Sequence, residues 1–146
     1  MIVLTAVLDK VLHLATLVGT DMTRFQQESG LTTSRTHLLW VLGAAGPSTQ
    51  QSLAAALGVS ARNVTGLVDG LVTSGHVTRQ THPTDRRATL VTPTAKGETA
   101  IRELRDSHEQ LARQLFEQVP AEQLAVFAAT LDQTITTFAR LMKETS

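Results

Sequence analysis

The sequence has 146 residues, of which 42% are hydrophobic, and these numbers fit one compact domain with a modest core rather than a multidomain enzyme. Thirteen Lys and Arg residues balance 13 Asp and Glu residues, so the chain as a whole lacks the basic charge of a nonspecific nucleic-acid binder. The absence of cysteine excludes a disulfide framework, a thiolate metal site, a catalytic thiol and a thiol redox switch, and it favours a cytoplasmic protein.

The first segment, about residues 1–28, has the pattern of a helix that is apolar around most of its girth. Asp9, Lys10 and His13 interrupt the apolar run, which argues against a signal peptide or a membrane span. A helix that is apolar on several sides is buried on several sides, and a small chain achieves this most easily by packing against a second copy. The segment therefore predicts a homodimer and no membrane partner. Its polar residues share one stripe: Thr5, Asp9, His13, Thr16 and Thr20.

Three shorter helices are expected next: residues 33–45, 49–57 and 60–74. Thr32 or Thr33 can cap the start of the first of these helices, and Gly46-Pro47 ends it. Ser60 is well placed to cap the start of the third.

Beyond Gly75 the apolar spacing changes from helical to alternating, which predicts a two-stranded hairpin. Its strands are expected at 76–82 and 88–92, with the tip at Pro83-Thr84-Asp85. Two long helices complete the chain, the second with an apolar stripe along one side: residues 94–118 and 121–143. Thr94 is expected to cap the first of them. Six helices and one hairpin predict an all-α fold with a small β-hairpin, in a single domain of residues 1–146.

The segment from Gln50 to Val72 has the residue pattern of a helix-turn-helix. Ala54 allows two crossed helices to approach closely, Gly58 allows the backbone conformation of a tight turn, and Val59 fills the corner. Such a unit offers the start of its second helix to the major groove of DNA. A helical corner without any role in DNA binding is the alternative that this pattern leaves open. Apolar residues of both helices are expected to face inward: Leu53, Leu57, Val64, Leu67 and Leu71.

The charge of this central region differs from the charge of the whole chain. Residues 47–97 contain five basic and two acidic side chains, a net charge of +3, whereas the rest of the chain contains eight basic and 11 acidic side chains. A basic module on an acidic body is typical of a DNA-binding protein whose other surfaces stay away from phosphates. Ordinary surface charge is the alternative interpretation.

Four stretches resemble the MarR family of winged helix-turn-helix regulators: Leu31-Thr32, the helix-turn-helix at 50–72, Ser74-Gly75-His76-Val77, and HPTDRRATLVTPTAKG from His82 to Gly97. The resemblance implies that residues 1–30 and 95–146 are dimerisation helices, with a winged helix-turn-helix at 31–94 inserted between them. It also implies that the second helix of the motif enters the major groove. In the wing, Arg87 would reach the minor groove and Asp85 would position it.

Side chains at the start of that helix and in the wing are the expected DNA contacts: Ser60, Ala61, Arg62, Asn63, Thr65, Arg86 and Arg87, with Asp85 as a positioning partner. Arg87 suits a narrow minor groove because its guanidinium is planar, permanently charged and rich in donors. Arg62 and Asn63 can read the edges of guanine and adenine. Thr65 can contact a phosphate or a methyl group.

Three residues of the same helix weaken the expected interface. Gly66 and Gly70 are predicted on the outward, DNA-facing side, and each costs the helix about 1 kcal/mol relative to alanine. Asp69 adds negative charge nearby. On this interpretation, lysine in place of Gly70 would strengthen both the helix and its binding to phosphates.

The expected function is a transcriptional regulator that binds a pseudo-palindromic double-stranded DNA operator as a homodimer. It is expected to act as a repressor whose operator binding is altered by a small aromatic or acidic effector. No glycine-rich phosphate loop, GxSxG elbow or HExxH pair is present, so no enzyme activity, catalytic residue or cofactor is expected. Two alternatives stay open: a metal-responsive regulator, and a winged-helix module that binds protein rather than DNA.

Five histidines bear on ligand binding: His13, His37, His76, His82 and His108. None has the i, i+4 spacing of a metal-binding pair, so no metal site is expected. The resemblance implies an effector pocket between the dimerisation helices and the DNA-binding part, with four candidate residues: His13, His37, Trp40 and His108. Because His108 lies on an apolar stripe between Leu104 and Leu111, a structural role in the core or the dimer interface is favoured for it.

Overall fold

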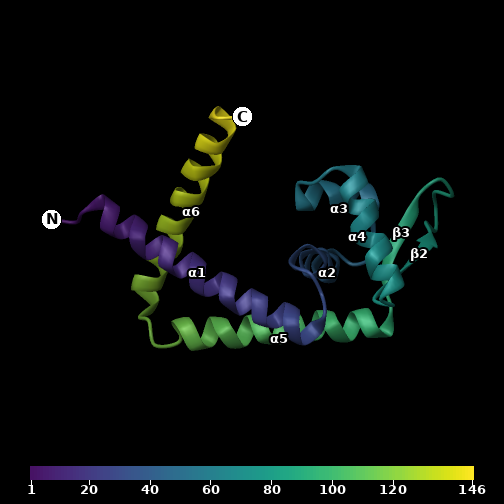
Figure 1. The fold of residues 1–146 in the computed structure, drawn as a ribbon, viewed down its shortest axis with the longest axis horizontal. Coiled ribbons are helices and arrows are strands. Elements are labelled where there is room, and N and C mark those ends of the chain that lie inside the picture. The colour runs from purple at the N-terminus through teal and green to yellow at the C-terminus, as the bar shows by residue number, and fades with distance from the viewer. The chain divides into compact units, whose positions relative to one another are not determined.

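Six helices and a small antiparallel sheet form the computed structural model, which describes residues 1–146 (Figure 1). In chain order the elements are α1 (Leu4–Ser29), α2 (Thr33–Ala45), β1 (Ser48–Thr49), α3 (Gln50–Leu57), α4 (Ala61–Thr73), β2 (Val77–Thr81), β3 (Thr89–Pro93), α5 (Ala95–Phe116) and α6 (Ala121–Glu144). The chain divides into two compact units, residues 1–104 and residues 105–146, and the division falls inside α5. The predicted fold class, all-α with a small β-hairpin, is confirmed.

Hydroxyl side chains begin several of these helices. Thr32, Ser60 and Thr94 each accept the backbone N–H of the residue three positions later, at 3.2, 3.1 and 3.1 Å. Each bond satisfies one of the N–H groups that the first turn of a helix leaves without an intrahelical partner. The predicted caps are therefore confirmed, and the cap of α2 is Thr32 rather than Thr33.

A tight turn joins α3 to α4, as the helix-turn-helix pattern predicts. Gly58 ends α3 with φ at 67°, in the left-handed region that favours glycine. The N–H of the next residue, Val59, donates to the carbonyl oxygen of Ala54 at 3.1 Å, which closes the corner. Val59 is partly buried against the core.

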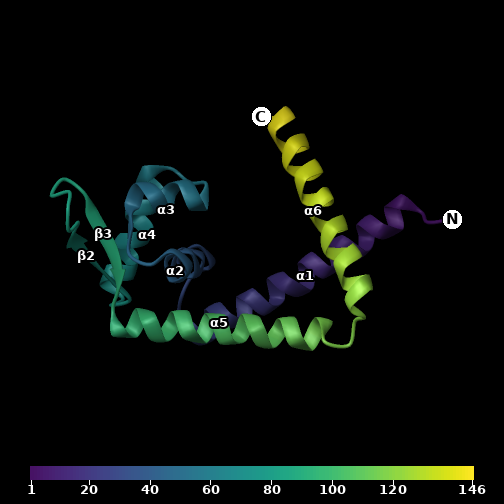
Figure 2. The same cartoon turned by 180° about the vertical axis from the view of Figure 1, so that it is seen from behind.

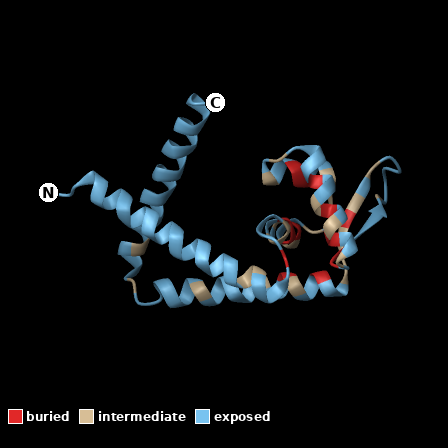
Figure 3. Cartoon of the chain, viewed as in Figure 1, coloured by how far each residue is buried: buried red, intermediate tan, exposed pale blue.

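The core lies among α2, α3, α4 and the sheet, which stand together in both ribbon views (Figures 1 and 2). Figure 3 shows the buried positions gathered on these elements and on the first turns of α5. All five residues expected to face inward pack in this core, three of them fully buried and two partly buried. Val68, which the pattern did not include, is also fully buried, because it follows Val64 by one turn on the same face of α4.

The sheet has three strands in the order β1-β3-β2, and both pairings are antiparallel. β2 and β3 form the predicted hairpin, with Val77 opposite Pro93. The expectation of a sheet with only two strands was wrong, because β1 adds a third strand beside β3, with Ser48 opposite Val91. A strand of two residues contains no alternation that a sequence pattern could reveal.

Two glycines let the start of α5 lie very close to its neighbours. An added Cβ at Gly97 would overlap the carbonyl oxygen of His76 and would lie 3.0 Å from its carbonyl carbon. On α2, an added Cβ at Gly43 would lie 2.5 Å from Cγ2 of Ile101, which is buried. The first turns of α5 are thereby packed directly against the winged part of the chain.

The terminal helices α1 and α6 bury none of their residues within this chain. Large apolar side chains on both are exposed to solvent, among them Leu8 and Leu17 on α1 and Phe138 on α6. None of the helices combines the length and the apolar character that a membrane span requires.

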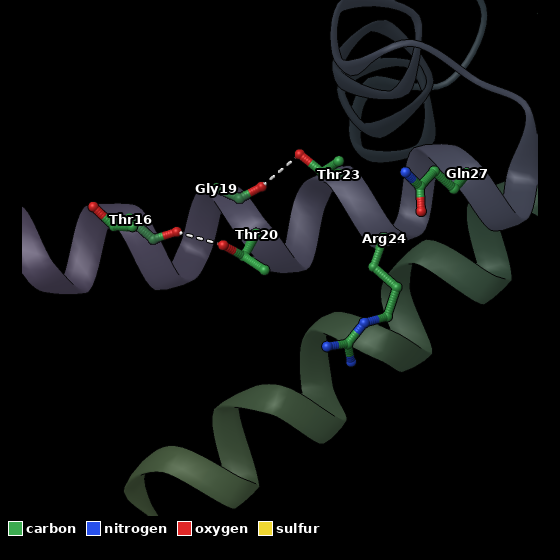
Figure 4. Close-up of a pocket in the computed structure, with 6 residues that line it drawn as sticks. All are labelled: Thr16, Gly19, Thr20, Thr23, Arg24 and Gln27. Carbon is green, nitrogen blue, oxygen red and sulfur yellow. Dashed lines mark hydrogen bonds between the residues drawn. The ribbon is translucent and has the colours of Figure 1, made fainter.

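The polar stripe of α1 continues toward the end of the helix as an open concavity (Figure 4). Its lining consists of Thr16, Gly19, Thr20, Thr23, Arg24 and Gln27. The hydroxyls of Thr16 and Thr20 donate to backbone carbonyls four residues earlier, both at 3.0 Å. These threonine donors are therefore satisfied within the helix itself.

Candidate nucleic-acid interface

The start of α4 is exposed, whereas one face of the helix is buried in the core. The residues expected to contact DNA from this helix are all exposed: Ser60, Ala61, Arg62, Asn63 and Thr65. At about 100° per residue, Arg62 lies on the side of α4 opposite the buried Val64 and Val68. Gly66, one turn beyond Arg62, is exposed, and an added Cβ there would point into open space, so its predicted outward position is confirmed.

The tip of the wing, between β2 and β3, holds Arg86 and Arg87, which are both exposed. The Oδ1 atom of Asp85 accepts the backbone N–H of Arg87 at 3.0 Å, and the carbonyl oxygen of Asp85 accepts that of Ala88 at 3.1 Å. Asp85 is thus joined to Arg87 through the main chain, and no ion pair links its carboxylate to the guanidinium. The arrangement fixes the backbone while the charged end of Arg87 extends into solvent.

His82 organises the other side of the same tip. Its Nδ1 atom accepts the backbone N–H groups of Thr84 and Asp85, both at 3.2 Å. Its own backbone N–H donates to the carbonyl oxygen of Ala88 at 3.0 Å. The sequence analysis considered His82 as a possible metal ligand and missed this role. A side chain that accepts the N–H groups of the residues two and three positions later is the usual pattern of a capped turn, so a signal was present.

A chain of polar side chains connects α3, α4 and the wing. Arg79 on β2 forms an ion pair with Asp69 on α4 at 2.6 Å, and its Nε donates to Oε1 of Gln50 at 3.0 Å. The amide nitrogen of Gln50 in turn donates to the hydroxyl oxygen of Thr65 at 3.0 Å. The negative charge of Asp69 is therefore balanced by Arg79, and Thr65, expected to contact DNA, is already engaged within the protein. Gln50 and Arg79 were not among the predicted site residues.

An open groove of about 480 Å³ runs between the start of α3 and the wing. Its lining is Thr49, Gln50, Gln51, Arg79, Asp85, Arg87, Ala88 and Thr89. The groove brings Arg79 and Arg87 to one surface although they come from different parts of the hairpin. Because Arg79 is paired with Asp69, the guanidinium of Arg87 is the cation that this open surface can offer to a phosphate backbone.

Gly70 does not lie on the outward face of α4, so its predicted position was wrong. An added Cβ at Gly70 would lie 2.6 Å from Cζ and Nε of Arg35, which reaches across from α2. The site is partly buried rather than open. Lysine at this position would displace the arginine instead of extending toward DNA, because the space beside Gly70 is already filled.

A buried histidine lies at the base of the wing, where α4, β2 and α5 meet. His76 is 7% exposed, and its Nδ1 atom lies 2.6 Å from Oγ of Ser74. Lys96 donates from Nζ to the carbonyl oxygen of Ser74 at 2.7 Å. Burial lowers the pKa of the His76 imidazole below its ordinary value, and the positive charge of Lys96 lowers that pKa further.

Comparison with known proteins shows which family and which solved structures this chain resembles. The sequence model described as the MarR family matches residues 29–88, from the end of α1 to the tip of the wing. A MarR protein from Peptoclostridium difficile has the same fold, with a TM-score of 0.75 over 100% of this chain and 97% of that one, at 17% identity. The segment of residues 29–88 is therefore similar to the MarR family, and the whole chain has the fold of a MarR protein.

Two further proteins are similar to this chain. FabT of Streptococcus pneumoniae, whose crystal structure is a complex with DNA, gives a TM-score of 0.77 at 19% identity, over 88% of this chain and 94% of that one. The uncharacterized HTH-type transcriptional regulator YcgE of Bacillus subtilis strain 168 is 38% identical over 64 residues. That match covers 44% of this chain and 42% of the length of YcgE.

The four residues expected to line an effector pocket come from three helices. His13 is exposed on α1, and His37 is exposed on α2, where Trp40 follows it at 36% exposure. His108 is exposed on α5, in the unit of residues 105–146. Their joint pocket stays a prediction. No group of three or more His, Asp and Glu side chains is arranged to hold a metal ion.

Proposed function

We propose that this chain is a DNA-binding transcriptional regulator. The observation that carries the proposal is the joint exposure of the start of α4 and of the wing arginines Arg86 and Arg87. Arg87 also lines the groove between the start of α3 and the wing. Arg62 and Asn63 at the start of a helix have the donors and acceptors that read base edges in a major groove. Arg87 at the tip of a hairpin supplies a cation suited to a minor groove.

The charge distribution and the relatives support the same assignment. Residues 47–97 carry a net charge of +3 in a chain whose total charge is zero, so attraction to phosphates is concentrated where α4 and the wing lie. FabT, which shares the fold, is crystallised with DNA, and YcgE is named as a transcriptional regulator.

The regulator acts as a homodimer built from the dimerisation helices at 1–30 and 95–146. Support comes from α1 and α6, whose apolar side chains are exposed in the single chain to an extent that soluble monomers avoid. A two-fold axis between two copies would offer two α4 helices to two half-sites, which is why the expected operator is pseudo-palindromic.

Regulation by a small ligand is the second part of the proposal. The regulator represses transcription in the cytoplasm. An aromatic or acidic effector that binds near His13, His37, Trp40 and His108 alters its affinity for the operator. Imidazole and indole groups suit such a ligand because they combine apolar rings with hydrogen-bond donors.

Selection of genomic DNA fragments by the purified protein, followed by sequencing of the bound fragments, tests DNA binding directly. Enrichment of one pseudo-palindromic motif is the expected result. Fragments no more similar than a random sample would contradict the proposal and favour a protein-interaction module. Dependence of the enrichment on added Zn²⁺, with loss on chelation, would instead indicate a metal-responsive regulator.

Two arginine variants separate the roles assigned within the interface. Arg62→Ala is expected to lose roughly 1–3 kcal/mol of binding free energy on the selected motif and to relax base preference at one position in each half-site. Arg87→Ala is expected to weaken binding to all related sites and to lower its salt dependence. Unchanged binding by Arg87→Ala would contradict the role of the wing.

A further inference from the structure

Arg35 of α2 lies across α4 at Gly70. Its Cζ and Nε atoms are 2.6 Å from the position that a Cβ at Gly70 would occupy, so the guanidinium fills the space that any other residue at this position would need. The Arg35 side chain is partly buried, and it rests against the backbone of α4. The pair Arg35 and Gly70 therefore brings a cation from α2 to the surface of a helix that has no basic residue beyond its first turn.

The guanidinium lies on one particular flank of α4. Val64, Val68 and Leu71 define the buried face of the helix. At 100° per residue, Asn63 and Gly70 share one flank beside that face, seven residues and about two turns apart. The opposite flank holds Thr65 and Asp69, which are engaged by Gln50 and Arg79.

The two flanks differ in charge. On the flank of Asp69, the carboxylate compensates the guanidinium of Arg79 at 2.6 Å. Arg35 has no such partner, since the ion pairs of the chain are Arg79 with Asp69 and Arg140 with Glu144. Only the flank that Arg35 covers therefore carries a positive charge without a neighbouring carboxylate. This charge lies beside the later turns of α4, beyond Arg62 and Asn63.

A helix of 10–12 Å diameter fills a major groove about 12 Å wide, so its flanks face the phosphates on both sides of the groove. We propose that Arg35 is a DNA-phosphate contact that α2 supplies to the flank of α4, and that Gly70 is required because it makes room for the guanidinium. A planar guanidinium supported on one side by a helix backbone keeps donors free for a phosphate oxygen. The inference rests on the proposed function.

The test is a salt titration of binding to the duplex selected from genomic DNA, with variants at both positions. Arg35→Gln is expected to weaken binding severalfold and to reduce the slope of log K against log salt by about 0.9 per subunit, the value for one lost phosphate contact. Base preference should not change, because phosphates carry no sequence information. Gly70→Ala should reduce the DNA affinity and the salt slope by the same amounts, because the new methyl group displaces the guanidinium of Arg35. The double variant Arg35→Gln and Gly70→Ala should bind DNA only slightly more weakly than either single variant.

Arg102→Gln is the matched control in charge and substitution, because Arg102 is an exposed arginine on another helix, engaged there with Thr99, and its loss should leave the slope unchanged. Arg35→Lys is a control for a folding defect, because it keeps the positive charge. It should keep the salt slope and lose part of the DNA affinity, since lysine lacks the planar guanidinium. An unchanged salt slope in Arg35→Gln, together with a reduced slope in Arg87→Ala, would overturn the role of Arg35 and leave the proposed DNA-binding function standing. A wild-type protein that binds no duplex would overturn the proposed function together with the inference.

Discussion

Two helical glycines, Gly97 on α5 and Gly66 on α4, show how much the surroundings of a residue decide its role. Any side chain at Gly97 would meet the carbonyl group of His76, and a backbone carbonyl held in a turn cannot move aside. Gly66 has no atom of another residue within 4 Å of the position of an added Cβ. The first glycine is required by packing, whereas the second only lowers the helix propensity of α4.

We therefore expect opposite effects on stability from the same substitution at the two positions. Gly97→Ala should destabilise the fold by about 1–3 kcal/mol or more, as overpacking does, and Gly66→Ala should stabilise it by up to about 1 kcal/mol. Urea unfolding of the two variants beside the wild type measures both changes. Equal stability of Gly97→Ala and the wild type would contradict the close approach of α5 to His76.

Single residues were predictable where their role depends on near neighbours in the sequence. Ser60 and Thr94 cap helices through N–H groups three residues away, and both were identified. Gly70 was misplaced because its surroundings are set by Arg35, 35 residues earlier in the chain, and helical periodicity carries no information about a side chain that arrives from another helix. For the same reason the pairing of Arg79 with Asp69 was not foreseen.

At the scale of elements, the wing depends on His82 to hold the backbone that carries Arg87. His82→Ala removes the acceptor of two N–H groups, each bond worth about 1 kcal/mol, and should loosen the tip. Faster amide hydrogen exchange at Thr84 and Asp85, with weaker DNA binding, is the expected result. His82→Asn is the control, because an asparagine oxygen can accept the same N–H groups. Equal exchange rates in His82→Ala and the wild type would contradict this role.

The junction of α4, β2 and α5 should make stability depend on pH. The pKa of His76 is lowered in the folded chain, whereas in the unfolded chain it takes its ordinary value of about 6.5. Above that pH both states are neutral and the full stability is present. Below it the unfolded chain binds a proton first, so stability falls with decreasing pH until the folded pKa is passed, with a slope of at most about 1.4 kcal/mol per pH unit.

Thermal unfolding between pH 8 and pH 5 checks this dependence. His76→Asn should remove the part of the fall that is due to His76, while His37→Asn, at an exposed position, should keep it. Identical pH profiles of His76→Asn and the wild type would show that His76 does not cause the fall.

The helices and the hairpin were foreseen because amphipathic spacing and caps are local signals. The bounds of α2 were predicted to the residue, and α5 ended two residues earlier than expected. β1 escaped notice because its existence depends on Val91 and Leu90, which lie more than 40 residues away. The groove beside the wing is likewise made by segments distant in sequence, so its residues Gln50 and Arg79 had no local signal.

At the scale of the whole molecule, the apolar faces of α1 and α6 predict association. Leu131→Asp places an unpaired charge on the apolar stripe of α6 and should dissociate the homodimer at micromolar concentration, as measured by sedimentation. Gln133→Asp introduces the same charge on the opposite side of the helix and should leave the assembly intact. A wild-type protein that sediments as a monomer would contradict the dimer.

The close contact of Gly97 with His76 also has a mechanical consequence. Thr94 reinforces it, since its N–H donates to the carbonyl oxygen of His76 at 3.0 Å and its hydroxyl to that of Gly75 at 2.6 Å. These contacts hold the first turn of α5 against the base of the wing, so that turn and the wing should move together. In the proposed homodimer, a change in the direction of the first turn of α5 would therefore change the separation of the two wings, and with it the half-site spacing that fits, without any contact to α4.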